Sequence, residues 1–156
     1  MNRFFRSVSV LCAAIVTILT IFPVNAAATA NTTTARWHGC YGATCRGKDP
    51  QVMGCATDAV TLAVRPYPGT ASAGYNQDVE LRYSAACNAR WARVTSRLAA
   101  GQIVYTTAYI AFHPLTRVTR YGARVVWSRM WSGLAQGCGV SVWTGDPTYK
   151  RANCAP

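Results

Sequence analysis

The chain has 156 residues, 51% of them hydrophobic and 13% charged, with a formal net charge of +11. This length suits one domain with its own hydrophobic core. The basic excess favours anionic partners or surfaces.

The N-terminal segment has the features of a Sec-type signal peptide, which we assign to residues 1–28. Basic residues come first, and an uncharged apolar run follows from Val8 to Phe22. Small residues then fit cleavage after Ala28 or Ala30. The apolar run has about 15 residues, fewer than the roughly 20 that a membrane-spanning helix needs. A retained N-terminal anchor is the alternative, but the pattern predicts an extracellular protein with no stable membrane span.

Cleavage changes the charge and defines the mature domain. Loss of Arg3 and Arg6 reduces the basic residues from 16 to 14 against five acids, which leaves a net charge of +9. Residues 29–36 are expected to form a flexible lead-in that reaches His38, and residues 37–156 form a single domain.

The mature sequence has the pattern of short β-strands separated by turns. Asp78 to Tyr83 alternates charged and apolar residues, the period of a half-buried strand. Further strands are predicted at Thr57 to Arg65, Gln102 to Phe112, Arg124 to Trp131 and Cys138 to Thr144. Gly and Pro residues mark the turns, including His113-Pro114 and Gly145-Asp146-Pro147.

One stretch, Cys87 to Leu98, fits two periodicities. Trp91, Val94 and Leu98 have helical spacing, whereas Cys87, Ala89 and Trp91 alternate as in a strand. We favour the strand. The predicted fold is therefore mainly β, a small antiparallel barrel or sandwich of about six short strands stapled by three disulfides.

Residues along nearly the whole mature chain resemble an uncharacterised bacterial family, domain-of-unknown-function family 2690. The resemblance is carried by the following residues: Cys40, Cys45, Gly47 to Pro50, Gly54, Cys55, Asp58, Ala59, Thr61, Glu80 to Ser84, Cys87, Ala89, Trp91 to Arg93, Ser128 to Met130, Cys138 and Cys154. The family occurs mainly in actinobacteria, as small secreted proteins and as a tail on helix-turn-helix regulators. The resemblance implies an extracytoplasmic β-rich module, and it supplies no known catalytic residues.

Six of the seven cysteines follow the leader, and an even number in an exported chain indicates disulfides. Several connectivities are compatible with six cysteines. We propose the pairs Cys40–Cys45, which closes a tight local loop, Cys138–Cys154, which pins the C-terminus, and Cys55–Cys87. Zinc is the alternative because His38 precedes Cys40, but the matched second pair of a zinc site is missing from the spacing. We therefore expect neither a metal nor another cofactor.

The sequence offers no catalytic signature. Asp58, Asp78, Glu80 and Asp146 are the acids available as a carboxylate pair, but Asp78 and Glu80 share one strand face with Arg82, as surface ion pairs do. Ser84, His113 and Asp58 can be combined into a Ser-His-Asp set only without a supporting motif. We therefore assign no catalytic residues and predict that the protein is not an enzyme.

Basic and aromatic residues give a stronger indication of binding. Eight arginines lie between Arg82 and Arg129, interleaved with tyrosine and tryptophan. Arginine binds phosphate or carboxylate, and aromatic rings stack on bases or sugars. Trp91 and Trp127 are expected in the core. Arg117, Arg120 and Arg124 are the candidate anionic-ligand site, and no motif indicates specific nucleic-acid binding.

The sequence thus predicts a secreted, basic, non-catalytic binding module. Its expected partner is an anionic cell-envelope polymer, such as a wall polymer, or the acidic surface of an extracellular protein. One alternative is a secreted inhibitor that acts on an extracellular enzyme through the disulfide-clamped loop Tyr41 to Asp49, because a rigid loop loses less entropy on binding. An uncharacterised hydrolase is a second alternative. The sequence does not indicate an oligomeric state.

Overall fold

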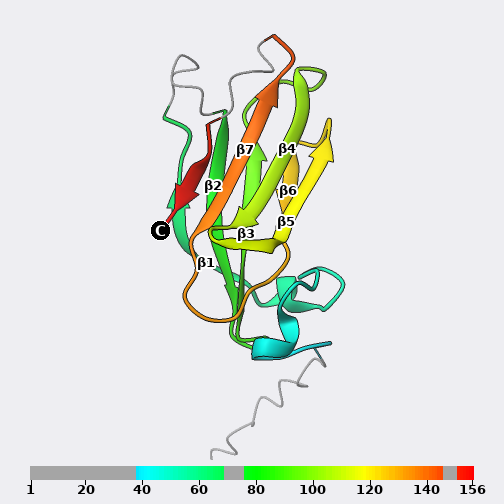
Figure 1. Cartoon of the computed structure of the whole chain (residues 1–156), viewed down its shortest axis with the longest axis vertical. Coiled ribbons are helices and arrows are strands. Elements are labelled where there is room, and N and C mark those ends of the chain that lie inside the picture. Colours follow the sequence, from blue (N-terminus) through cyan, green and yellow to red (C-terminus); the bar gives the residue numbers. More distant parts are fainter. Residues whose placement is uncertain (1–37, 69–75, 146–150) are drawn as a thin grey trace, which may run out of the picture. The chain divides into compact units, whose positions relative to one another are not determined.

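The computed structural model describes residues 38–68, 76–145 and 151–156, whose ribbon is coloured in Figure 1. The predicted leader and lead-in lie outside these residues. The elements in chain order are η1 (Gly42–Cys45), η2 (Cys55–Thr57), β1 (Val60–Arg65), β2 (Gln77–Ser84), β3 (Ala89–Ser96), β4 (Ile103–Ile110), β5 (His113–Tyr121), β6 (Val125–Trp127), β7 (Gly137–Trp143) and β8 (Asn153–Ala155). None of the helices in the described ranges is long and apolar enough to cross a membrane.

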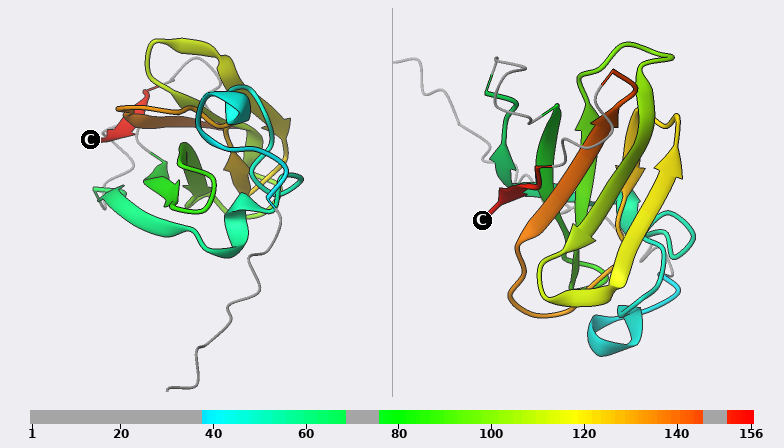
Figure 2. Two further views of the ribbon diagram at one scale, coloured as in Figure 1. Left: turned by 90° about the horizontal axis from the view of Figure 1, so that it is seen from below. Right: turned by 45° about the horizontal axis from the view of Figure 1, so that its top comes forward.

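The strands form two antiparallel sheets of four strands each. Sheet A has the order β1-β2-β3-β6, and sheet B has the order β5-β4-β7-β8. One sheet covers the other, as Figures 1 and 2 show from three directions. The prediction of a mainly β, antiparallel fold is confirmed, and the arrangement is the sandwich.

Alternating apolar residues of both sheets build the core between them. Val79 of β2 and Val94 of β3 are fully buried and meet Ile110 of β4 in one cluster. Burying a side chain of this size contributes about 1.5–3 kcal/mol. Gly139 of β7 lies so close to β3 that an added Cβ would clash with Cγ2 of Val94. Close packing of the two sheets therefore requires a glycine at this position.

A buried polar residue joins the two sheets along the side of β1 and β8. The Gln77 side-chain amide donates to the carbonyls of Gly139 and Arg151, at 3.0 and 3.1 Å. Its oxygen accepts the N–H groups of Asn76 and Ser141, at 2.8 and 3.2 Å. All four hydrogen-bonding positions of the amide are thus occupied, which is what a buried amide needs in order not to destabilise the core.

Several of the strands predicted from the sequence are present in the structure, and others have different bounds. The ambiguous stretch Cys87 to Leu98 contains β3, as favoured. The predicted strand Thr57 to Arg65 is shorter in the structure: Thr57 is the last residue of η2, and β1 begins only at Val60. The predicted strand Arg124 to Trp131 is shorter, since β6 ends at Trp127.

Two strands were not predicted, β5 and β8. His113-Pro114, expected as a turn, forms the start of β5, which is an edge strand of sheet B. A proline is tolerated there because an edge strand has one side without ladder hydrogen bonds. Trp91 is 1% exposed, as expected for a core residue, whereas the same expectation for Trp127 is wrong because its exposure is 37%.

Candidate functional site

Long-range backbone hydrogen bonds bring the cysteine-rich segment beside β5. The N–H of Gly47 donates to the carbonyl of Met130 at 3.0 Å, and the N–H of Met130 donates to the carbonyl of Lys48 at 2.9 Å. The N–H of Arg129 in turn donates to the carbonyl of Thr116 in β5 at 2.8 Å. Residues 47–48, 129–130 and 116 therefore form three adjacent backbone segments.

A groove of about 470 Å³ lies over these three segments. Its lining residues are Gly47, Lys48, Asp49, Val52, Met53, Leu115, Arg117 and Arg129. The groove is largely open to solvent rather than enclosed. The groove combines three cationic side chains with an apolar wall, so it suits an anionic group attached to a less polar body. We call it the cationic groove.

The charges of the cationic groove are only partly balanced. Its one carboxylate, Asp49, accepts the N–H of Gln51 at 2.9 Å and lies 3.5 Å from the guanidinium of Arg129. The exposed side chains of Lys48 and Arg117 have no acidic partner among the described residues. Two positive charges are therefore available for a ligand.

Arg117 also borders a second, smaller pocket of about 190 Å³. The other lining residues of this pocket are Tyr109, Ile110, Phe112, His113 and Pro114. The guanidinium of Arg117 stands 4.7 Å from the ring centroid of Tyr109, a cation–π contact that limits where the side chain can point. Arg117 is thus held between an apolar pocket and the cationic groove.

The structure does not unite the three arginines of the predicted patch. Arg117 and Arg120 are an odd number of residues apart on β5, so their side chains point to opposite faces of sheet B. Arg120 is paired with Thr106, which is buried between the sheets, whereas Arg117 lies over Tyr109 on the outer face. Arg124 follows the far end of β5. Only Arg117 belongs to the cationic groove, and its partners there are Lys48 and Arg129.

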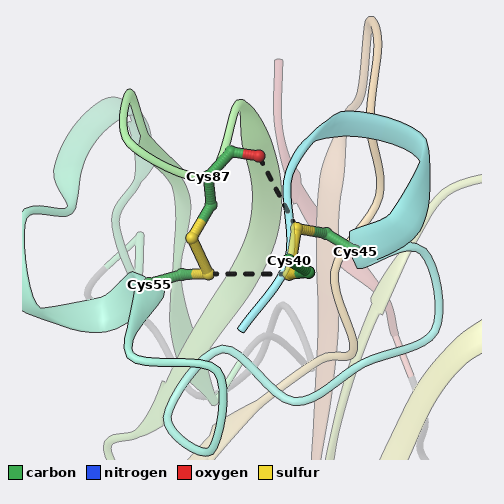
Figure 3. Close-up of side chains that lie close together, drawn as sticks. All are labelled: Cys40, Cys45, Cys55 and Cys87. Atoms are coloured by element: carbon green, nitrogen blue, oxygen red, sulfur yellow. Dashed lines mark hydrogen bonds between the residues drawn. A yellow bond between two sulfur atoms is a disulfide. The ribbon is translucent and has the colours of Figure 1, made fainter. Parts of the chain in front are cut away.

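Three disulfides join Cys40 with Cys45, Cys55 with Cys87, and Cys138 with Cys154, the same pairs that the sequence analysis proposed. Two of them lie side by side in Figure 3, where the sulfur of Cys40 is 3.9 Å from that of Cys55. These two disulfides fix the segment that forms one wall of the cationic groove.

The four sulfur atoms of these two disulfides all lie within 4.8 Å of one another. Four cysteine sulfurs this close together are also found in zinc sites, and here Cys55 and Cys87 form the second pair that is missing from the sequence spacing. In the structure, however, the sulfurs are bonded in pairs, and disulfide sulfurs are not the thiolates that ligate zinc. The cluster therefore acts as a covalent clamp in this state.

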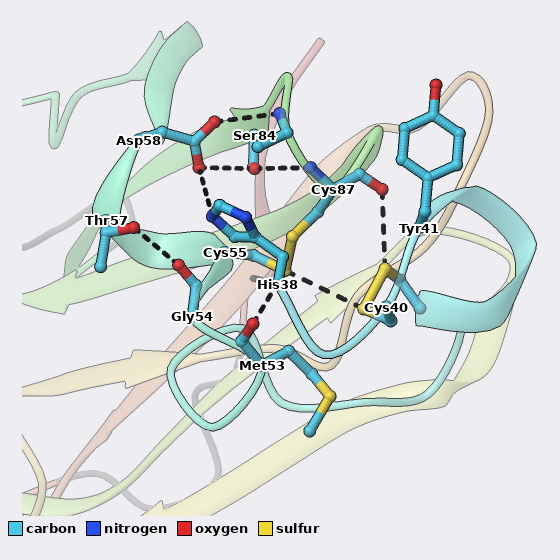
Figure 4. Close-up of a disulfide and its surroundings, with 12 residues drawn as sticks. His38, Cys40, Tyr41, Met53, Gly54, Cys55, Thr57, Asp58, Ser84 and Cys87 are labelled. Atoms are coloured by element: carbon cyan, nitrogen blue, oxygen red, sulfur yellow. Dashed lines mark hydrogen bonds and ion pairs between the residues drawn. A yellow bond between two sulfur atoms is a disulfide. The ribbon is translucent and has the colours of Figure 1, made fainter. Parts of the chain in front are cut away.

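Asp58 organises the turn after β2, as Figure 4 shows. Its carboxylate accepts the hydroxyl of Ser84 at 2.6 Å and the N–H of Ala86 at 3.1 Å. His38 lies 3.7 Å away and is packed against the domain, which corrects its expected place in a flexible lead-in. Burial alone would raise the pKa of Asp58, but the hydrogen bonds from Ser84 and Ala86, together with His38, lower it.

The same geometry argues against a hydrolytic triad at this place. In a triad a histidine stands between the nucleophile and the acid. Here the acid stands between Ser84 and His38, and Ser84 is fully buried. The combination of Ser84 and Asp58 with His113 is also not formed, since His113 stacks on Trp131 at 3.6 Å.

The remaining acids of the predicted strand face are covered by arginines. Glu80 contacts Arg93 at 2.6 Å and Arg82 at 3.4 Å, and Asp78 contacts Arg97. They form surface ion pairs on sheet A, as the sequence analysis expected. Asp146 lies outside the described residues.

No curated protein and no solved structure matches the chain. A family model described as "Protein of unknown function (DUF2690)" matches residues 43–152. This match includes both walls of the cationic groove and four of the six disulfide cysteines, Cys45, Cys55, Cys87 and Cys138. The chain therefore belongs to the DUF2690 family of proteins of unknown function.

Proposed function

We propose that this protein is an extracellular, non-catalytic module that binds an anionic cell-envelope polymer through the cationic groove. The observation that carries the proposal is the pair of exposed cations, Lys48 and Arg117, that face one groove without an acidic partner among the described residues. Cations left unpaired in a groove attract anions and raise their local concentration.

Two further features support the proposal. Backbone pairing through Met130 and the disulfide of Cys40 and Cys45 hold the groove walls before any ligand arrives, which reduces the entropy lost on binding. Three disulfides also suit an oxidising compartment, as expected for an exported protein. The acidic surface of an extracellular protein would offer carboxylates to the same groove.

The test is retention on immobilised polyanions by a variant with Lys48→Gln and Arg117→Gln. Each charge-assisted hydrogen bond contributes about 1.5 kcal/mol to binding. Since about 1.4 kcal/mol changes a dissociation constant ten-fold, the affinity of the variant should fall about ten-fold or more. Polyphosphate and polygalacturonate columns distinguish phosphate from carboxylate recognition. Binding should also weaken with salt, because the Debye length falls from about 10 Å at 0.1 M to about 3 Å at 1 M.

The structure supplies a matched control, Arg120→Gln with Arg124→Gln. Both side chains are exposed, neither lines the cationic groove, and the net charge equals that of the first variant. An equal loss of retention in both variants would show that only net charge matters and would refute the groove. Arg90, Arg93 and Arg97 are unsuitable as controls because they bond Gly133, Glu80 and Asp78.

A second candidate function is enzyme inhibition through the loop Tyr41 to Asp49. The loop contains η1, clamped by the disulfide of Cys40 and Cys45, and Tyr41 at its start is 64% exposed. A rigid exposed loop is a suitable shape for insertion into an enzyme cleft. A salt-resistant one-to-one complex with a secreted hydrolase, lost on Tyr41→Ala, would favour this function over polymer binding.

A further inference from the structure

Four large apolar side chains are exposed at the end of the domain that carries the cationic groove. Phe112 is 96% exposed, Leu134 93%, Leu115 79% and Val52 75%. They come from the β4–β5 turn, the loop before β7, β5 itself and the segment after η1. Single exposed apolar residues are common, but a contiguous group of them marks an interaction surface.

Hydrogen bonds and shared pockets make this group contiguous. The N–H of Ala111 donates to the carbonyl of Gln136 at 3.0 Å, which holds the turn of Phe112 against the loop of Leu134. Arg117 lines both the pocket of Phe112 and the groove of Leu115 and Val52. In Figure 2 (right) the β4–β5 turn, the loop that leads into β7 and η1 gather at one end of the sandwich. We call this end the apolar tip.

The backbone at the apolar tip is strained to present an aromatic side chain. Phe112 has a φ of +63°, a conformation that costs little for glycine but is unfavourable for a bulky residue. Its side chain is almost fully exposed, so no burial within the domain compensates for the strain. Strain retained without a structural gain indicates a function for the side chain.

Positive charge surrounds the apolar tip. Lys48 and Arg117 flank Leu115 and Val52 in the cationic groove, and Asp49, the only acid of that groove, is engaged by Arg129. Arg46, also in the segment after η1, lies over the ring of Trp131 with no acid beside it among the described residues. Exposed apolar side chains within a basic surface are the combination that binds anionic lipid bilayers.

We propose that the apolar tip docks on an anionic lipid bilayer, with Phe112 and Leu134 inserted among the acyl chains and Lys48 and Arg117 at the headgroups. The proposal rests on the proposed function for its cations and adds the apolar insertion and the lipid partner. Phe112 and Leu134 come from separate loops and are 96% and 93% exposed, so both side chains are free to enter a bilayer. Sheet A, whose acids are covered by arginines, stays away from the bilayer.

The test measures co-sedimentation with vesicles of phosphatidylcholine containing phosphatidylglycerol, and with vesicles of phosphatidylcholine alone. Wild type and variants are compared as the exported forms without the predicted leader, so that the apolar run from Val8 to Phe22 does not bind the vesicles itself. The main variant is Phe112→Gly with Leu134→Ser, since glycine relieves the strained φ and the melting temperature should not fall. Leu62→Ser is the control, an exposed apolar residue on β1 at the edge of sheet A.

We expect the wild type to prefer the anionic vesicles and the main variant to bind them about ten-fold or more weakly, the factor that burial of such side chains provides. Its retention on polyphosphate should stay unchanged, and Leu62→Ser should behave as the wild type. The lipid proposal is overturned if the main variant and the wild type bind the vesicles equally. It is also overturned if the wild type binds no vesicles but captures a protein that the main variant does not capture. Neither result affects the proposed function, which is tested separately: it fails if Lys48→Gln with Arg117→Gln retains polyphosphate binding, or if the Arg120 and Arg124 control loses as much.

Discussion

At the scale of single residues, some polar side chains are held by several hydrogen bonds, whereas two exposed cations have no acidic partner among the described residues. Gln77 and Asp58 have several hydrogen bonds each, and their roles are to join strands and shape a turn. Lys48 and Arg117 are exposed beside a groove and have no acid to balance them among the described residues. Engaged groups stabilise the fold, and open ones are available to a ligand.

Asp58 leads to a prediction about pH. Its pKa is lowered in the folded state, so its contribution to stability is present above the unfolded pKa of about 4 and is lost as the pH falls through the folded value. Asp58→Asn should cost about 1 kcal/mol at pH 7 through weakened hydrogen bonds to Ser84 and Ala86. The difference between wild type and variant should shrink below about pH 4 in thermal melts. A difference that is constant from pH 7 to pH 2 would show that the charge of Asp58 does not contribute.

At the scale of elements, the strands that sequence could predict are those with one clearly buried face. β2 alternates charged residues with Val79 and Leu81, and the apolar set packs in the core. β5 escaped prediction because both of its faces mix polar and apolar residues, with Leu115 beside Arg117 on the outer face. An edge strand with a solvated outer face has no periodic apolar signal for sequence reasoning to find.

The same reasoning explains how much of the candidate site could be predicted. Arg117 was identified from the density of basic and aromatic residues. Lys48 and Arg129 were not connected with it, because the hydrogen bonds through Met130 and Thr116 that bring them together span large sequence separations. The sequence places Arg120 in the same predicted site as Arg117, because without a predicted β5 it does not show that the two side chains point to opposite faces of a strand.

The disulfides give a prediction at this scale. The bridge of Cys55 and Cys87 spans a sequence separation of 32 and joins η2 to the β2–β3 turn, whereas that of Cys40 and Cys45 spans 5. The chain-entropy model assigns them about 3.7 and about 2 kcal/mol. Replacing Cys55 and Cys87 by Ala should therefore lower the melting temperature more than replacing Cys40 and Cys45. The reverse order would show that the tight loop, through its packing beside Cys55, controls the stability of the domain.

At the scale of the whole molecule, the distribution of charge matters more than its sum. On sheet A the acids Asp78 and Glu80 are covered by arginines, so this face presents balanced pairs. The end formed by the segment after η1 and the start of β5 carries cations in excess of acids. A basic protein with this asymmetry approaches an anionic surface with one preferred end.

The most direct test of the cationic groove is an NMR titration of the ¹⁵N-labelled protein with short-chain polyphosphate. The account predicts that amide shifts concentrate in residues 47–53, 115–117 and 129, which form the groove, and that they reverse at high salt. The amides of Arg120 and Arg124, which are also exposed but lie outside the groove, should keep the chemical shifts of the free protein. Shifts spread evenly over the basic residues, or centred on Arg120 and Arg124, would contradict a specific anionic-ligand site.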